Sequence, residues 1–415
     1  MNDGPAGAGE ATSGAYRRVR EVTTSLCETL ATEDFVVQSM PDASPAKWHL
    51  AHTTWFFETF VLRNLPGHGP FHAAYEVLFN SYYNAVGEQF PRAERGLLSR
   101  PTVSEVMRYR KHVDEAMTRA LDGGRLDPPL RAVVTLGLNH EQQHQELLLT
   151  DVKHLLSLNP LRPAFRERPA DAAGAAPPLR FVRFAGGIRE IGFAGTGFSF
   201  DNETPRHRRL LADFEIASRP VTNSEFLDFI DDGGYRRPEL WLSEGWAAVR
   251  EERWTSPMHW DIAAGRTFTL AGPRELDRAE PVCHVSYFEA DAYARWAGAR
   301  LPLEDEWEVA AAAAPVAGNL LERGRLHPAA APSGDGEIVQ LFGDVWEWTA
   351  SPYVGYPGYR ADEGALGEYN GKFMCNQFVL RGGSCVTPQD HVRASYRNFF
   401  PPRTRWQFSG IRLAR

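Results

Sequence analysis

Several common signals are missing from this sequence of 415 residues. No apolar run approaches the roughly 20 residues that a membrane-spanning helix needs, so an integral membrane protein of the helical kind is excluded. The chain has only four cysteines, and none of them has C-x-x-C spacing. A disulfide framework is therefore not expected. The few scattered cysteines instead predict a protein of a reducing compartment. The formal net charge of -8 argues against non-specific binding to nucleic acid.

The N-terminus has no basic region followed by an apolar core, so we expect no secretory signal and a cytoplasmic protein. Residues 1–13 are rich in Gly, Ala and Asp and are expected to form a flexible tail. The length suits two or three domains. Nothing in the composition indicates a nucleic-acid, membrane or obligate protein partner, which leaves small molecules as the expected partners.

Residues 14–160 have the pattern of a helical domain. Two expected helices precede a long excursion, residues 66–100, and two follow it, an order that predicts a four-helix bundle. Loops as long as this excursion are usually functional in compact domains. Thr102 and Glu105 have the spacing of a capping box. The expected helices are Ser13–Leu30, Pro45–Leu65, one that starts at Pro101 and one that starts near Pro129.

The second half of the chain has a different texture. Residues 161–179 are rich in Pro, Ala and Arg and predict a linker. Residues 180–415 alternate short β-like runs with Gly, Pro and Trp, which predicts a mixed, loop-rich α+β domain. The expected strands are Arg180–Phe184, Arg208–Ile216 and Phe378–Arg381, and the expected helices are Asn223–Asp231 and Tyr287–Gly298.

A histidine pair in the last expected helix carries the strongest chemical signal. His140 and His144 lie four residues apart, so both imidazoles project from one helical face and can reach one metal ion. Two hydrogen-bonded core histidines would give the same spacing. Residues 140–144 also match the H-E-x-x-H motif of zinc proteases. Leu147 and Thr150, however, occupy the positions where the metzincin pattern has Gly and His.

Eight strings in the second half occur in the order typical of one known family. They resemble the formylglycine-generating-enzyme (sulfatase-modifying factor) family, which implies a variant of the C-type lectin fold. Cys385 has no second cysteine close behind it, which argues against sulfatase modification. The strings begin at Gly186-Gly187, Asp201-Asn202-Glu203, Arg219-Pro220, Pro281-Val282, Arg300-Leu301-Pro302, Gly343-Asp344, Arg381-Gly382-Gly383 and Gly410-Ile411.

The helical half resembles the DinB-like bundle, and the two domains together resemble the sulfoxide synthases of ergothioneine and ovothiol biosynthesis. The shared motif is H-x3-H-x-E, here His140, His144 and Glu146, and His52 matches the third ligand. The resemblance implies Fe(II) as cofactor and O2 as co-substrate. Three imidazoles leave positions on iron open for substrates. The end of the chain at Arg415 favours the ergothioneine branch.

The resemblance also implies a thiol pocket in the excursion. Arg92 and Arg95 match a pair of arginines that hold the carboxylate of the thiol substrate, a task that suits the bidentate guanidinium. Tyr82 and Tyr83 resemble the tyrosine pair of the branch that uses cysteine. A tyrosine there could donate a proton and direct the reaction away from thiol dioxygenation. We expect one of the two rings to serve packing alone.

Gln143 and Asn398 match residues that contact trimethylhistidine, called hercynine. Its quaternary ammonium cannot donate a hydrogen bond, so aromatic side chains such as Phe399 and Phe400 are expected to line the pocket. Relatives that use γ-glutamylcysteine have Asp at the position of Phe400. The absence of that carboxylate favours free L-cysteine. His49, one turn before His52, is expected to be structural.

The sequence therefore predicts an iron- and O2-dependent sulfoxide synthase that joins L-cysteine to hercynine. Three alternatives remain open. A sibling enzyme could use γ-glutamylcysteine or a selenosugar as donor, or histidine as acceptor. A non-catalytic metal-binding module and a zinc hydrolase are the more remote alternatives.

Overall fold

Two separate stretches of sequence make up the first unit of the computed structural model, which describes residues 5–168, 174–332 and 338–415. The first stretch runs to Pro160, and the second is the short segment Asp362–Tyr369. The second unit comprises Leu161–Ala361 and Asn370–Arg415. In the described part of the chain, no helix is both long and apolar enough to cross a bilayer.

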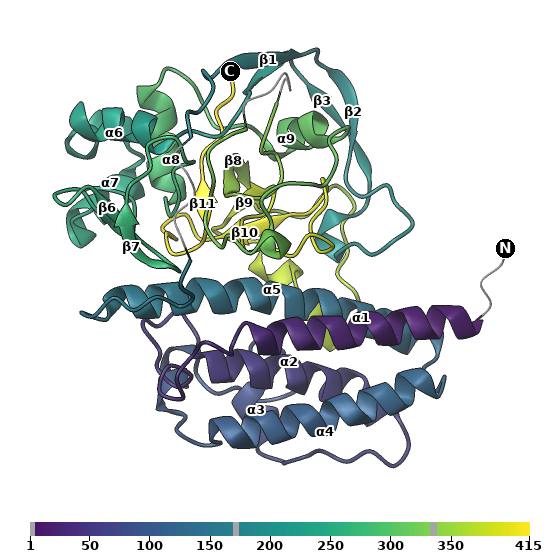
Figure 1. The fold of residues 1–415 in the computed structure, drawn as a ribbon. Coiled ribbons are helices and arrows are strands. Elements are labelled where there is room, and N and C mark those ends of the chain that lie inside the picture. The colour runs from purple at the N-terminus through teal and green to yellow at the C-terminus, as the bar shows by residue number, and fades with distance from the viewer. Residues whose placement is uncertain (1–4, 169–173, 333–337) are drawn as a thin grey trace. The chain divides into compact units, whose positions relative to one another are not determined.

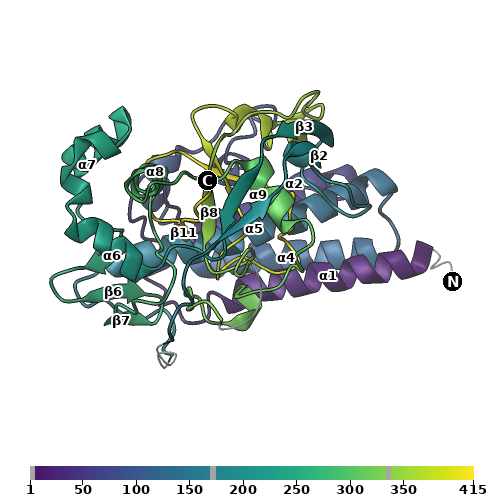
Figure 2. The same cartoon turned by 90° about the horizontal axis from the view of Figure 1, so that it is seen from above.

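Four long helices run side by side in the first unit and confirm the predicted helical bundle (Figure 1, Figure 2). α2 packs against α4 and α5, and α1 packs against the same two helices. The pair of helices that carries the predicted metal ligands, α2 and α5, is therefore in direct contact. The four are α1 (Pro5–Ser25), α2 (Ala46–Phe60), α4 (Val103–Asp122) and α5 (Pro128–Leu158).

Local capping fixes where these helices begin. The Thr102 hydroxyl accepts the Glu105 backbone N–H, and the Glu105 carboxylate accepts that of Thr102, which is the predicted capping box. Asp127 caps α5, and a proline follows it at the first helical position.

Two predicted helices differ from the structure. The expected helix Pro45–Leu65 is α2, which ends at Phe60 and is followed by the 3-10 turn Leu62–Asn64, and α1 differs at both ends. α1 begins at Pro5, inside the stretch that we expected to be a tail, and it ends at Ser25 rather than Leu30. Proline suits a first helical turn, and the alanines after it favour helix continuation. Residues 26–29 form turns instead of helix.

The excursion between α2 and α4 is more regular than a plain loop. It contains α3 (Tyr75–Phe79) and two 3-10 turns, Leu62–Asn64 and Arg92–Leu97. The buried amide of Asn80 donates to the carbonyl oxygens of Tyr83 and Gly87 and so holds the turn after α3. This turn presents Tyr82 and Arg95 from a fixed backbone.

The second unit is a mixed α+β domain, as predicted. Its largest sheet has the order β10-β9-β8-β11, with β8 antiparallel to β9 and parallel to β11. In both views α6 and α7 lie on one side of this sheet and the β2–β3 hairpin on the other (Figure 1, Figure 2). The helices are α6 (Asn223–Asp231), α7 (Ser243–Glu252), α8 (Tyr287–Trp296) and α9 (Glu304–Ala311). The strands are β1 (Phe181–Phe184), β2 (Gly187–Ile191), β3 (His207–Leu211), β4 (Phe214–Ala217), β5 (Trp260–Asp261), β6 (Arg266–Thr269), β7 (Gly272–Glu275), β8 (Trp346–Pro352), β9 (Phe378–Arg381), β10 (Asn398–Phe400) and β11 (Ser409–Gly410).

The predicted elements of this unit needed three corrections. The expected strand Arg208–Ile216 is two strands, because a turn around Asp213 separates β3 from β4 and the Asp213 carboxylate accepts the Gly186 N–H. The expected helix Tyr287–Gly298 ends two residues early, at Trp296. Sequence periodicity also missed α7 and α9, which have eight to ten residues and few apolar positions.

Two of the strings that carry the family resemblance also hold this unit together. Glu347 accepts hydrogen bonds from Arg412 and from the Trp307 indole. Gly382 has a φ of 98°, and a Cβ there would lie 2.4 Å from the Leu341 carbonyl oxygen. Only glycine fits such an approach.

Candidate metal centre

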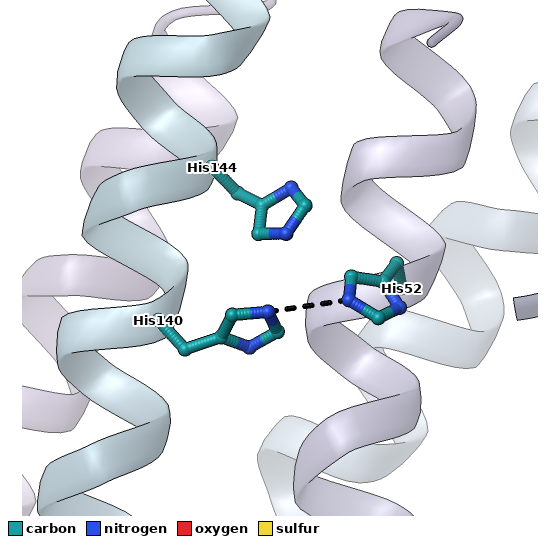
Figure 3. A group of neighbouring side chains, drawn as sticks. All are labelled: His52, His140 and His144. Atoms are coloured by element: carbon teal, nitrogen blue, oxygen red, sulfur yellow. Dashed lines mark hydrogen bonds between the residues drawn. The ribbon is translucent and has the colours of Figure 1, made fainter. Parts of the chain in front are cut away.

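Three buried histidines from two helices face one another in the first unit. His52 comes from α2, and His140 and His144 come from successive turns of α5 (Figure 3). One ring nitrogen from each lies within 4.8 Å of the others. These are the three residues that the sequence predicted as metal ligands, and the structure brings them together.

The spacing of the nitrogens fits a shared cation. Nε2 of His52 and Nε2 of His140 are 3.2 Å apart. Two imidazole nitrogens bound about 2.1 Å from one metal lie roughly 3.0 Å apart at a right angle and roughly 3.4 Å apart at the tetrahedral angle. The observed separation falls between these limits, so the pair can bind one ion without moving far.

A hydrogen bond determines which ring nitrogen of His52 carries the proton. Its Nδ1 lies 2.6 Å from the carbonyl oxygen of Phe79, which can only accept. Nδ1 therefore carries the proton, and the Nε2 lone pair faces the other two rings. In the described part of the chain, Nδ1 of His140 has no hydrogen-bond partner, so no acceptor there fixes the tautomer of this ring.

Burial also keeps these rings neutral. Loss of water lowers the pKa of His140 to about 3. It lowers the pKa of His52 and of His144 well below the ordinary value, and neighbouring histidines add to both shifts. A metal binds the neutral imidazole, so the site does not have to lose protons first.

His144 makes a further contact on the side away from the site. Its Nδ1 lies 2.8 Å from Nδ1 of His49, whose Nε2 lies 3.0 Å from the Asp151 carboxylate. His49 does not belong to the group of three possible ligands. Sequence reasoning treated His49 as structural and did not single out Asp151.

The glutamate of the H-E-x-x-H string has no role as a base. Glu141 is fully buried and accepts hydrogen bonds from Arg20, Arg110 and Thr23. Although burial raises its pKa, the charges of Arg110 and Arg20 lower it to about 2. This carboxylate is held away from the histidine nitrogens, which weakens the zinc-hydrolase alternative. Glu146 is also buried.

A cationic group lies close to the three histidines. The Arg95 guanidinium is buried and stacks on Trp48, with Cζ 3.3 Å from the ring centroid. The same indole stacks on the His52 ring, with centroids 4.5 Å apart. Arg95 donates to the hydroxyls of Ser44 and Ser81, but no described carboxylate forms an ion pair with it.

That environment is unfavourable for an unpaired cation. Burial lowers the pKa of Arg95 well below its ordinary value, Arg92 lowers it further, and Asp151 opposes the shift. A buried charge without a partner predicts an anionic ligand. Arg92, by contrast, is exposed and donates to the carbonyl oxygen of Asp42.

The three tyrosines near the site differ in position. Tyr83 is fully buried, packs against Trp55 and stacks on Tyr82. Burial raises its pKa well above the ordinary value. Tyr369 lies with its ring 5.5 Å from that of His140, and Tyr82 is 6.3 Å from Tyr369. Tyr369 therefore lies with its ring against a predicted ligand, and Tyr82 lies beside Tyr369.

The segment Asp362–Tyr369 is what brings Tyr369 here. The Glu368 carboxylate accepts the backbone N–H groups of Asn84 and Ala85, at 3.0 and 2.7 Å. The Tyr369 hydroxyl donates to the side-chain oxygen of Gln143. Local sequence patterns gave no signal for this contact, because its partners lie in different halves of the chain.

The remaining predicted substrate residues lie on β10 of the second unit. Phe399 stacks on Tyr353 with centroids 4.0 Å apart, and Phe400 meets Trp406 edge to face. The Asn398 side chain accepts the Phe399 N–H. The expected aromatic surroundings are present within this unit, and the role of these residues in binding stays a prediction.

Comparison with known families divides the chain into the same two main parts as the structure. Residues 15–148 match the DinB superfamily, and residues 169–336 and 328–415 match the sulfatase-modifying factor enzyme 1-like domain. The formylglycine-generating enzyme of Streptomyces coelicolor is 30% identical over 277 residues, which cover 54% of this chain and 83% of that protein.

Other relatives match almost from end to end. Hercynine oxygenase of Mycolicibacterium thermoresistibile is 34% identical over 400 residues, or 90% of this chain and 88% of that protein. Hercynine oxygenase of Mycolicibacterium smegmatis is 35% identical over 402 residues, or 91% of this chain and 92% of that protein. With both domains and the three histidines in place, the chain belongs to the hercynine oxygenase family.

Proposed function

We propose that this protein is an iron(II)- and O2-dependent sulfoxide synthase of ergothioneine biosynthesis, with hercynine as acceptor and L-cysteine as thiol donor. The observation that carries the proposal is the buried group His52, His140 and His144 in a member of the hercynine oxygenase family. Bound iron(II) would supply the redox chemistry that couples O2 reduction to thiol oxidation.

The reaction balances with the substrates named. One S–H bond of cysteine and one C–H bond of the imidazole break, and a C–S bond and an S–O bond form. One atom of O2 ends in the sulfoxide, and the other leaves as water with the two hydrogens. At least one proton must reach the reduced oxygen, so a proton donor beside the histidines is required.

Tyr82 and Tyr369 are the candidates for that donor. The Tyr369 ring packs edge to face against His140. Tyr82, which lies on the turn after α3, is next to Tyr369. The Tyr83 ring stacks on that of Tyr82, which fits the packing role that we expected for one ring of the pair. A phenol at this position carries a proton that it can give to an oxygen that becomes basic.

Arg95 supports an amino-acid thiol as the donor. A carboxylate bound to its guanidinium would neutralise a buried cation and use donor atoms that remain available, since its Nε has no partner among the described residues. Arg95 and His52 both lie against the ring of Trp48, which would place a carboxylate bound to Arg95 near the histidines. Arg92, which is exposed, would attract the substrate rather than hold it.

Phe400 supports free cysteine over γ-glutamylcysteine. Its neighbour is Trp406, and neither ring offers the negative charge and hydrogen-bond acceptors that a carboxylate would give the ammonium of a glutamyl group. Gln143, Asn398 and Phe399 are the proposed hercynine contacts. Stacked rings such as Phe399 and Tyr353 present the negative face that a quaternary ammonium favours.

Anaerobic reconstitution with iron(II), followed by addition of hercynine, cysteine and O2, tests this function. Mass spectrometry should find the hercynine–cysteine sulfoxide. Hercynine that stays unchanged while metal binds would favour a non-catalytic metal-binding module. A product formed only with another thiol would favour a sibling enzyme.

A further inference from the structure

We propose that His49 and Asp151 form a hydrogen-bonded relay that fixes the proton of His144 on Nδ1 and so aims its Nε2 lone pair at the metal. The inference rests on the proposed metal at His52, His140 and His144. It makes His49 and Asp151 positioning residues, since neither touches the metal or a substrate.

Three contacts in sequence build the relay. The Asp151 Oδ2 accepts the backbone N–H of Ser44 at 2.8 Å and lies 3.0 Å from Nε2 of His49. Nδ1 of His49 then lies 2.8 Å from Nδ1 of His144. All four residues are buried, so bulk water does not compete for these bonds. His144 Nε2 is left on the other edge of its ring, toward His140 and His52 (Figure 3).

The positions of the protons follow from the end of the relay. The Asp151 oxygen acts as an acceptor toward Ser44, and toward His49 it needs a donor, so Nε2 of His49 carries the proton. Neutral His49 then has its lone pair on Nδ1. Two facing nitrogens need one proton between them, and it must come from Nδ1 of His144. The opposite assignment would put the His144 proton on Nε2, where it would block the metal.

The relay ends on a charged acceptor, whereas the hydrogen-bond partner of His52 is neutral. His52 donates to a neutral carbonyl, whereas His144 donates, through His49, to a carboxylate. Anionic partners of a ligand imidazole raise its basicity and fix its ring, and their loss typically weakens metal binding 10- to 100-fold. His144 is therefore expected to be the ligand that depends most on a distant charge.

The relay also connects the two helices that supply the ligands. His49 belongs to α2 and lies one turn before His52, while Asp151 belongs to α5 and lies two turns after His144. Each helix thus supplies a metal ligand and a relay residue to the other.

A tautomer measurement tests the relay without any change to the chain. In 15N-histidine-labelled protein, metal-free and zinc-loaded, multiple-bond 1H–15N correlations report which ring nitrogen is protonated, with peaks assigned from single histidine variants. We expect protons on Nδ1 of His144 and on Nε2 of His49 in both forms. A proton on Nδ1 of His49, or on Nε2 of His144 in the metal-free form, would overturn the relay.

Metal affinity provides the second test, by chelator competition with Co(II) and with anaerobic Fe(II). We expect Asp151→Asn to raise the dissociation constant about tenfold and His49→Phe about a hundredfold. The double variant should match His49→Phe alone, because Asp151 acts only through His49. The control Asp114→Asn removes a carboxylate that pairs with Arg20 and touches no ligand, so it should leave affinity unchanged.

The outcomes separate the relay from the proposed metal site. If wild-type protein binds neither ion, the metal site itself is wrong. If wild type binds and Asp151→Asn binds equally well, the relay is wrong while the metal site stands. Equal losses in Asp151→Asn and Asp114→Asn would mean general destabilisation and would also overturn the relay.

Discussion

The Tyr369 hydroxyl donates a hydrogen bond to the side-chain oxygen of Gln143, although 226 positions separate the two residues. Gln143 directly precedes His144, and the Tyr369 ring lies against His140. A tyrosine from the second half of the sequence is thereby fixed on the helix that carries two of the three histidines. This position, rather than its neighbours in sequence, makes Tyr369 a candidate proton donor.

Removal of that phenol should change the product rather than stop the reaction. In Tyr369→Phe both substrates and O2 would still bind, but the phenol proton is missing, so we expect a shift from sulfoxide toward cysteine sulfinate. Tyr82→Phe should give the same shift if Tyr82 is the donor. The matched control is Tyr83→Phe, which changes a packed ring. Product ratios by mass spectrometry decide between them, and an unchanged ratio in all three variants would exclude this tyrosine cluster.

Substitution of Arg95 should affect one substrate selectively. Arg95→Leu removes the buried cation proposed to bind the cysteine carboxylate, and loss of a charged hydrogen bond costs about 1.5–3 kcal/mol, or roughly ten- to a hundredfold. We expect the KM for cysteine to rise by that factor and the KM for hercynine to stay within about twofold. Arg92→Leu, at an exposed position, should have a smaller effect. Equal rises for both substrates would contradict the assignment of Arg95.

The choice of thiol donor can be measured in one vessel. With cysteine and γ-glutamylcysteine in competition, cysteine should have the higher kcat/KM, because Phe400 offers no partner to the glutamyl ammonium. Phe400→Asp should reduce the difference in kcat/KM between cysteine and γ-glutamylcysteine. A wild-type preference for γ-glutamylcysteine would refute this account of the donor.

Acid should destabilise the second unit through Glu304. Burial raises the pKa of Glu304, but the charges of Arg397 and Arg381 outweigh it and lower the pKa below the ordinary value. The unfolded chain therefore binds this proton at higher pH than the folded one. Its stabilising contribution is complete above about pH 4.5 and falls as the pH drops below that value.

The Glu304→Gln variant tests this expectation. At pH 7 it should lower the free energy of unfolding by about 3–5 kcal/mol, because it leaves the buried Arg397 without its carboxylate and Arg381 with Glu308 alone. Its stability should also fall less steeply than wild type below pH 4.5. Glu363→Gln, at an exposed position, is the control and should behave like wild type. Denaturant unfolding at several pH values gives both quantities.

How much of this was predictable depended on sequence distance. The spacing of His140 and His144 on one helix is local, so periodicity was enough to pair them. His52 and the two-domain order came from the family resemblance. The start of α1 at Pro5 was missed because low-complexity Gly/Ala sequence suits a tail as well as a helix.

Contacts between distant segments could not be predicted from local patterns. His49 and Asp151 belong to different helices, and their pairing depends on the register of α2 against α5. Tyr369 directly follows the short 3-10 turn Ala365–Glu368, which Glu368 ties to the turn after α3. Arg95 was predicted to bind a carboxylate, but only the structure distinguishes its burial from the exposure of Arg92.

The most direct test of the central claim combines metal binding with product analysis. Wild-type protein and His140→Ala are each titrated anaerobically with iron(II) and then given hercynine, cysteine and O2. We predict one iron per wild-type chain and formation of the hercynine–cysteine sulfoxide, with neither iron retention nor product in His140→Ala. Full iron loading and turnover in His140→Ala would contradict the three-histidine site and the function proposed for it.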